Sequence, residues 1–186
     1  MNVIDAIQNR RSIKRFTARQ LTRAEIEGLL AAVLAPNHRL TQPWRFYVLG
    51  PEARYGYGFA LGARKAKKIE DPAAAQKLKE TIGEEHRALP LMLVVAVADN
   101  AETPEIREED YAATMMAIQN VMLAAVDAGF GTSIKSGAVM SDPAARAAAG
   151  VKDGERIVAV INIGEPAEVP PPKARSEAPS VTTWMP

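Results

Sequence analysis

Apolar positions along the 186-residue chain fall into blocks with two different periods. Segments rich in branched apolar residues predict four strands, at 45–49, 91–98, 132–135 and 156–163. Helical spacing predicts helices at 2–10, 22–34, 109–128 and 143–150. With a further helical region between the first two strands, the order is helix–helix–strand–helix–strand–helix–strand–helix–strand–tail. This order predicts a layered domain of helices and strands.

Local signals define several helix ends. Thr22 with Glu25 three residues later predicts a capping box, and Pro36 ends that helix. Gly129 is placed to cap the helix 109–128 in the left-handed conformation. Residues 51–89 have helical character without a clear apolar face, and the segment Tyr-Gly-Tyr-Gly at 55–58 predicts irregular backbone.

The helix 109–128 is apolar almost all round, which indicates burial in a large core or in a subunit interface. After Gly164 the chain becomes rich in proline, which favours an extended segment. We therefore expect a single domain over residues 1–186 whose tail, residues 165–186, packs on a partner subunit.

Composition excludes several classes of function. A net charge of +1 disfavours generic nucleic-acid binding. The chain has no cysteine and only two histidines, which excludes disulfides and thiolate chemistry and predicts no metal site. Charged residues interrupt the N-terminal apolar positions, and the apolar run at 89–98 is too short to cross a bilayer. We expect a cytoplasmic protein without a membrane segment.

The clearest chemical signal is the basic heptad, residues 10–16, with the sequence Arg-Arg-Ser-Ile-Lys-Arg-Phe. Four cations around one hydroxyl predict a cradle for a phosphate or another polyanion. A solvated run of charge is the alternative. Lys173 and Arg175 lie two residues apart in an extended segment, so their side chains point the same way and could close on the same anion.

Two glycine-rich segments are poor matches to nucleotide-binding motifs. The glycines at 56, 58 and 62 have the wrong last spacing for a dinucleotide fingerprint. The segment 129–136 has Ile134 where a P-loop needs glycine, and it follows a helix where a P-loop follows a strand. Its backbone N–H groups could still bind the edge of a planar ligand.

The loop 37–43 leads through Pro43 and Trp44 into the first strand, and burial of Trp44 would anchor the start of that strand. His38 in this loop either packs structurally or projects toward a ligand. We expect His86 to be a surface or helix-end residue.

In this order, the motifs resemble those of the FMN-dependent nitroreductase superfamily, and most closely its small-subunit branch. The resemblance covers essentially the whole chain. It rests on Arg-Arg-Ser-Ile-Lys at 10–14, Ala-Pro at 35–36 with Gln-Pro-Trp-Arg-Phe at 42–46, Gly-Phe-Gly at 129–131 with Ser-Gly at 136–137, and Gly-Glu-Pro at 164–166.

This resemblance implies an α+β fold, with a central mixed sheet wrapped by helices. It also implies an intertwined homodimer with an extended C-terminal tail, and FMN at each subunit interface.

The resemblance assigns FMN contacts to residues from four parts of the chain. Around the phosphate and ribityl chain it places Arg10, Arg11 and Ser12, with Lys173 and Arg175 completing the phosphate site. At the flavin ring it places Lys14 near N1 and O2, and the segment Ile134, Lys135, Ser136 and Gly137 near O4 and N5. It places His38 on the FMN of the other subunit. Arg15 receives no role and is expected to face solvent.

The implied activity is NAD(P)H-dependent hydride transfer through FMN, by a ping-pong mechanism, to a nitroaromatic, quinone or activated alkene. No side chain needs to act as an acid or base. The alternatives are a flavin-binding redox sensor or carrier without turnover, in which the region 51–89 closes the site, and a small anion-binding protein that uses the heptad alone.

Overall fold

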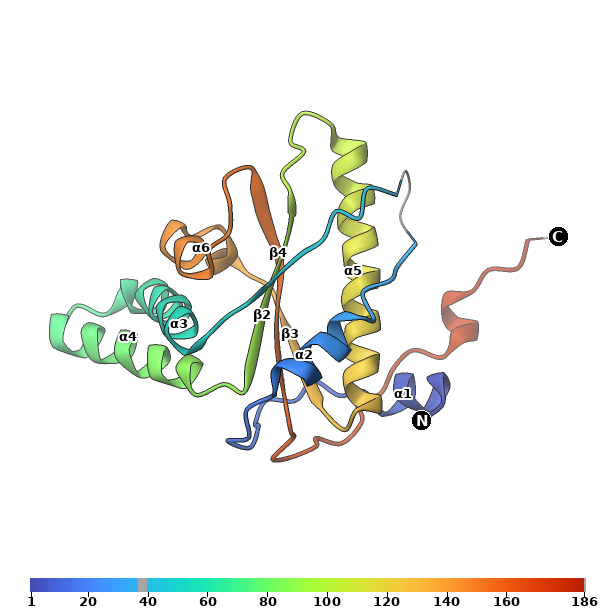
Figure 1. Ribbon diagram of the computed structural model, residues 1–186, viewed down its shortest axis with the longest axis horizontal. Coiled ribbons are helices and arrows are strands. Elements are labelled where there is room, and N and C mark those ends of the chain that lie inside the picture. Colours follow the sequence, from blue (N-terminus) through green and yellow to red (C-terminus); the bar gives the residue numbers. More distant parts are fainter. Residues whose placement is uncertain (37–39, 186) are drawn as a thin grey trace.

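The computed structural model describes residues 1–36 and 40–185 (Figure 1). The helices are α1 (Val3–Asn9), α2 (Arg23–Leu30), α3 (Pro51–Lys65), α4 (Pro72–Arg87), α5 (Pro104–Asp127) and α6 (Pro143–Ala149). The strands are β1 (Arg45–Val48), β2 (Leu91–Ala98), β3 (Gly131–Lys135) and β4 (Glu155–Gly164). Short 3₁₀ helices lie at η2 (Ala66–Lys68), η3 (Ala138–Ser141) and η4 (Ala178–Val181).

The four strands form one sheet in the order β1-β2-β4-β3, and every neighbouring pair is antiparallel. An isolated parallel bridge, outside the four strands, joins Ser12 to Thr132 at the β3 edge. The α+β class and the strand positions predicted from the sequence are confirmed.

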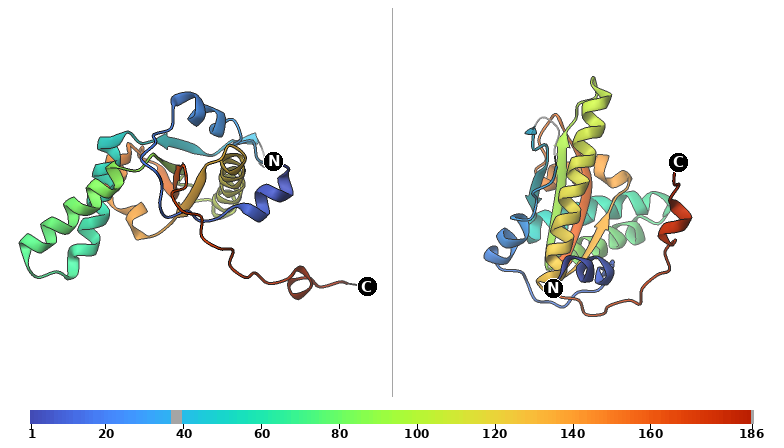
Figure 2. Two further views of the ribbon diagram at one scale, coloured as in Figure 1. Left: turned by 90° about the horizontal axis from the view of Figure 1, so that it is seen from below. Right: turned by 90° about the vertical axis from the view of Figure 1, so that its right-hand side faces the viewer.

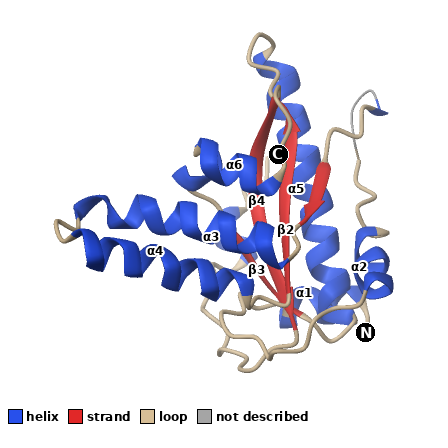
Figure 3. Cartoon of the chain, turned by 60° about the vertical axis from the view of Figure 1, so that its left-hand side comes forward, coloured by secondary structure: helices blue, strands red, loops and turns tan. Residues whose placement is uncertain are grey.

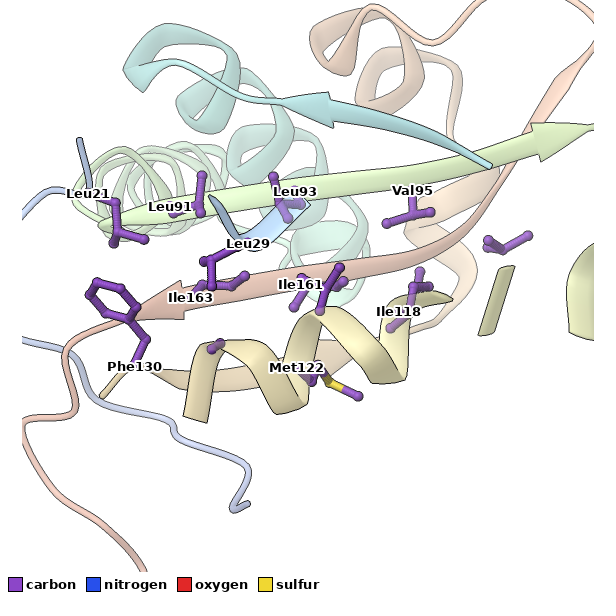
Figure 4. Packing of buried hydrophobic residues seen from close by; sticks show 14 of the residues in the cluster. Leu21, Leu29, Leu91, Leu93, Val95, Ile118, Met122, Phe130, Ile161 and Ile163 are labelled. Atoms are coloured by element: carbon purple, nitrogen blue, oxygen red, sulfur yellow. The ribbon is translucent and has the colours of Figure 1, made fainter. Parts of the chain in front are cut away.

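Helices cover both faces of the sheet. Side chains of β2 alternate between the two faces, because successive residues of a strand point to opposite sides. Leu91, Leu93 and Val95 pack with α2, α5 and Phe130 in one core cluster (Figure 4). Met92 and Val94 pack with α3 and α6 in a second cluster on the other face. The result is a three-layer arrangement.

The predicted irregular backbone at 55–58 is wrong, because these residues lie within α3. Their glycines form a packing face. A Cβ at Gly58 would lie 2.6 Å from the carbonyl oxygen of Ile82, and a Cβ at Gly62 would lie 2.7 Å from the Cα of Lys79. The absent side chains let α3 and α4 pack closely as an antiparallel pair (Figure 3).

Helix α5 begins at Pro104, five residues before the predicted start at 109. Its first turns carry charged, partly exposed side chains, so they lack the apolar spacing on which the prediction rested. At its other end, Gly129 has φ +82°, which confirms the predicted left-handed conformation. Within the described chain, no helix is both long enough and apolar enough to cross a membrane.

The C-terminal tail leaves the body of the molecule and is exposed along nearly all of its described length (Figure 2). Its packing against a partner subunit stays a prediction, as does the division of the chain into one domain.

Candidate functional site

The basic heptad is held against the edge strand of the sheet. Ile13 is 2% exposed, and its backbone N–H donates to the carbonyl oxygen of Thr132 at 2.9 Å. Gly131 makes this close approach possible, because a Cβ there would lie 2.3 Å from Cγ1 of Ile13. With Ile13 buried, its neighbours Ser12 and Lys14 are exposed on the outer surface.

The beginning of the tail pairs with the end of the heptad. The N–H of Thr17 donates to the carbonyl oxygen of Glu165 at 2.9 Å, and the N–H of Ala167 donates to the carbonyl oxygen of Arg15 at 3.0 Å. An antiparallel bridge between Phe16 and Pro166 lies between these bonds. This pairing directs the following residues of the tail across the heptad.

A cavity of about 650 Å³ lies between the heptad and the tail. This volume is within the range of pockets that bind small molecules and cofactors. Its lining includes six of the residues predicted to bind cofactor: Arg10, Arg11, Ser12, Lys14, Lys173 and Arg175. Cations separated by more than 150 positions in the sequence therefore face one space.

Most of the charge in this pocket is not neutralised by the protein. Arg15 pairs with Glu168 at 3.5 Å, and both side chains are largely exposed, so Arg15 faces solvent as predicted. Across residues 1–36 and 40–185, no ion pair involves Arg10, Lys14, Lys173 or Arg175. The resulting positive field favours an anionic ligand.

Two features of this pocket were not predicted from the sequence: the local hydrogen bonds of Arg11 and the presence of Glu168. Nη1 of Arg11 donates to the carbonyl oxygens of Gln8 at 2.6 Å and Arg10 at 3.0 Å, so part of its hydrogen-bonding capacity is used locally. Glu168 was missed as a lining residue. Its position four residues after Gly164 was the available signal, but only the pairing of the tail with the heptad brings it to the pocket.

The segment 134–137 does not line this pocket within the single chain. The Ile134 side chain packs against the core, whereas Lys135 and Ser136 line a second, smaller cavity. Three residues of extended strand separate Lys135 from Thr132, the bridge partner of Ser12, which corresponds to about 10 Å. Gly137 follows with φ +144°.

The pKa of Lys135 is lowered by its surroundings. Although the residue as a whole is exposed, desolvation where its side chain lines the second cavity lowers its pKa, and the nearby charge of Lys65 lowers it further. The positive charge of Lys65 outweighs the nearby negative charge of Glu85 in its effect on this pKa, so the region favours negatively charged groups.

The prediction for His38 lies outside the described residues. The following residues Leu40 and Gln42 have φ values of +52° and +45°, which are uncommon for residues with a side chain. Between them, Oγ1 of Thr41 donates to Oδ1 of Asp110 at 3.3 Å, which attaches this loop to α5.

Trp44 is half-buried rather than fully buried, so it anchors the strand less than predicted.

His86 lies at the end of α4, as one of the two predicted alternatives has it, but it is only 8% exposed. Burial of the ring lowers its pKa. This burial has no local sequence signal, because the covering residues come from α3 and from the sheet.

Comparison with known proteins gives a consistent result. The sequence model of the Nitroreductase family matches residues 7–165. "Putative NAD(P)H nitroreductase YfhC" of Bacillus subtilis is 38% identical over 176 residues, which cover 92% of this chain and 88% of that protein.

Two crystal structures resemble this fold. A nitroreductase-like family protein from Bacillus cereus has a TM-score of 0.82 and 27% identity, and the match covers 100% of this chain and 96% of that chain. The FMN- and NADPH-dependent nitroreductase NfnB from sphigopyxis sp. strain HMH has a TM-score of 0.79 and 19% identity, over 100% of both chains. The residues matched by the family model include the heptad and the whole sheet, and the chain belongs to the nitroreductase family.

Proposed function

We propose that the protein is an FMN-dependent NAD(P)H oxidoreductase. One observation carries the proposal: cations from both ends of a nitroreductase-family chain line one ligand-sized pocket. Relatives named as NAD(P)H nitroreductases, and a neighbour of the same fold described as FMN- and NADPH-dependent, support the choice of cofactor and reductant.

The lining fits the phosphate end of FMN. Arg10 and Ser12 would bind the phosphate and the ribityl chain, with Arg11 beside them. Lys173 and Arg175 would close the phosphate site from the other side. Guanidinium and ammonium groups form strong charge-assisted hydrogen bonds with phosphate oxygens, and these cations are available because they form no ion pair among the described residues.

The ring end of the site would lie farther along β3. Lys14 would lie near N1 and O2 of the flavin, where a fixed cation stabilises negative charge. Backbone N–H groups of residues 135–137 would meet O4 and N5, and His38 of the partner subunit would contact the same cofactor. The chemistry that bound FMN supplies is hydride transfer from NAD(P)H to an electron-poor acceptor, with the two substrates using one site in turn.

The test measures binding of FMN and of riboflavin, which lacks the phosphate, to the same apoprotein. Arg10→Ala is expected to weaken FMN binding by about 10- to 100-fold, because a charge-assisted hydrogen bond contributes about 1.5–3 kcal/mol. Riboflavin binding should stay unchanged. Arg23→Ala is the matched control, because Arg23 lies on α2 with a side chain that is 91% exposed and pairs only with a neighbouring glutamate among the described residues.

A protein that stays colourless with added FMN contradicts the proposal. Equal losses of FMN and riboflavin affinity in Arg10→Ala would contradict the assigned phosphate role. A yellow protein that oxidises no NAD(P)H with nitroaromatics, quinones or activated alkenes would instead be a flavin-binding sensor or carrier.

A further inference from the structure

The second cavity, of about 90 Å³, lies behind the segment 135–137. Its wall is formed by the sheet, α3, α4 and η3. Most of the lining is apolar, from Leu61, Met92, Val139, Met140 and Val160. Lys135 and Ser136 are exposed, so they mark its opening toward solvent.

Three polar side chains line the cavity and are more than nine-tenths buried. Tyr57 is 2% exposed, Asn162 is 3% exposed and His86 is 8% exposed. Within the described part of the chain, neither the hydroxyl of Tyr57 nor Oδ1 of Asn162 has a hydrogen-bond partner. A buried polar atom left unpaired is destabilising, so a partner is expected where there is space for one.

His86 adds an acceptor to this inventory. Its Nδ1 lies 2.8 Å from the carbonyl oxygen of Ile82. A carbonyl oxygen only accepts, so Nδ1 carries the proton and Nε2 of the neutral ring is an acceptor. Burial lowers the pKa of His86, which keeps the ring neutral near pH 7.

We propose that this cavity binds a cluster of ordered water molecules, which hydrogen-bonds Tyr57, His86 and Asn162 and connects them to solvent at Lys135 and Ser136. The cavity has room for about three waters at roughly 30 Å³ each. Water supplies both the donors that Nε2 of His86 and Oδ1 of Asn162 require and an acceptor for the hydroxyl of Tyr57.

Water fits this lining better than a small anion does. Lys135 at the opening would attract an anion, but the two inner acceptors, Nε2 of His86 and Oδ1 of Asn162, would repel it. An apolar solute would leave all three buried polar groups unpaired. Buried waters typically make two to four hydrogen bonds to buried polar groups that lack another partner. The opening at Lys135 and Ser136 is where the proposed FMN site would place the flavin ring, so the waters would meet solvent in the apoprotein and the ring in the holoprotein. The test itself does not require bound FMN.

The test measures Tm of the purified protein and its variants, because a hydrated and a dry cavity predict changes in Tm of opposite sign. Tyr57→Phe removes a hydroxyl and leaves the ring. With water bound, the loss of its hydrogen bond is expected to lower Tm by about 2–4 °C; in a dry cavity, removal of an unpaired hydroxyl raises Tm. Asn162→Leu is a second, nearly isosteric variant with the same two expectations.

Thr132→Val is the matched control. Its Oγ1 is also buried without a partner in the described chain, but Thr132 does not line the cavity, so Tm should rise or stay constant. A high-resolution crystal structure should show water within hydrogen-bond distance of the Tyr57 hydroxyl. Tyr57→Phe and Asn162→Leu variants with unchanged or higher Tm would overturn the proposal. So would a Tm of the native chain that rises with formate or nitrate and fails to rise in Tyr57→Phe, because an anion would then be the ligand.

Discussion

At the scale of single residues, the contact between Gly131 and Ile13 determines where the basic side chains lie. Gly131→Ala would place a methyl group within 2.3 Å of the Ile13 side chain, so the heptad must move away from β3. We expect a loss of about 1–3 kcal/mol in the free energy of unfolding, together with weaker FMN binding. Urea denaturation and a flavin fluorescence titration measure the two effects.

Gly28→Ala is the control for this substitution, because an added Cβ on Gly28 meets nothing within 4 Å. It should leave FMN affinity unchanged. Unaltered FMN affinity in Gly131→Ala would show that the heptad does not depend on this close approach.

His86 gives the protein a defined pH dependence. Burial lowers the pKa of the folded imidazole below the ordinary 6.5, so the unfolded chain binds a proton first as the pH falls. The free energy of unfolding is therefore not reduced by His86 above about pH 6.5, and it decreases as the pH falls toward the lowered pKa of the folded state. Denaturant melts at pH 7.5 and 5.5 should show this loss, and His86→Gln should reduce it. If both proteins lose the same free energy of unfolding between pH 7.5 and pH 5.5, the pH dependence comes from other groups.

The sequence predicted Arg10, Ser12 and Lys14 as candidates because a cluster of unlike donors within five residues is visible without a structure. It did not predict the buried environments of Tyr57, His86 and Asn162. Each comes from a different element, and their shared cavity depends on how α3 and α4 pack on the sheet. Side chains that meet only through tertiary packing have no local sequence signal.

At the scale of elements, the strands were predictable because continuous branched apolar residues distinguish β2 and β4 from their surroundings. Helix α3 was not, because its glycines were interpreted as breaks in the backbone. In the structure they form a face where α4 approaches closely, and the many remaining helix contacts offset their low helix propensity.

Gly58, which packs against α4, and Gly28, which is exposed on α2, should respond to alanine substitution in opposite directions. Gly58→Ala should destabilise the protein by about 1–2 kcal/mol, because overpacking against α4 exceeds the gain in helix propensity. Gly28→Ala on the exposed part of α2 should stabilise it by about 0.5–1 kcal/mol. Equilibrium unfolding of both variants tests the sign. Stabilisation by Gly58→Ala would mean that α4 can move to accommodate a methyl group at this position.

At the scale of the whole molecule, large apolar side chains remain exposed on α1, α5 and the tail. They include Val3, Ile4, Ile7, Met116 and Val181. Exposed apolar surface of this kind marks an interaction site, which supports the predicted homodimer. We expect a dimer by light scattering coupled to size exclusion.

Removal of residues 167–186 should weaken both association and FMN binding, because the tail carries Lys173 and Arg175 as well as apolar residues. The double substitution Lys173→Ala and Arg175→Ala separates the two effects. It should weaken FMN binding by about tenfold or more and leave the dimer intact. A truncated chain that remains fully dimeric would exclude the tail from the interface.

Trp184 lies near the end of the tail and is 89% exposed, whereas the only other tryptophan, Trp44, is half-buried just before β1. The emission of an indole ring depends on the polarity around it. In a Trp44→Phe variant, Trp184 would be the only tryptophan, located at the segment predicted to change its surroundings on association. The shift of its emission spectrum with protein concentration would then report, without any added label, whether a second subunit covers the tail.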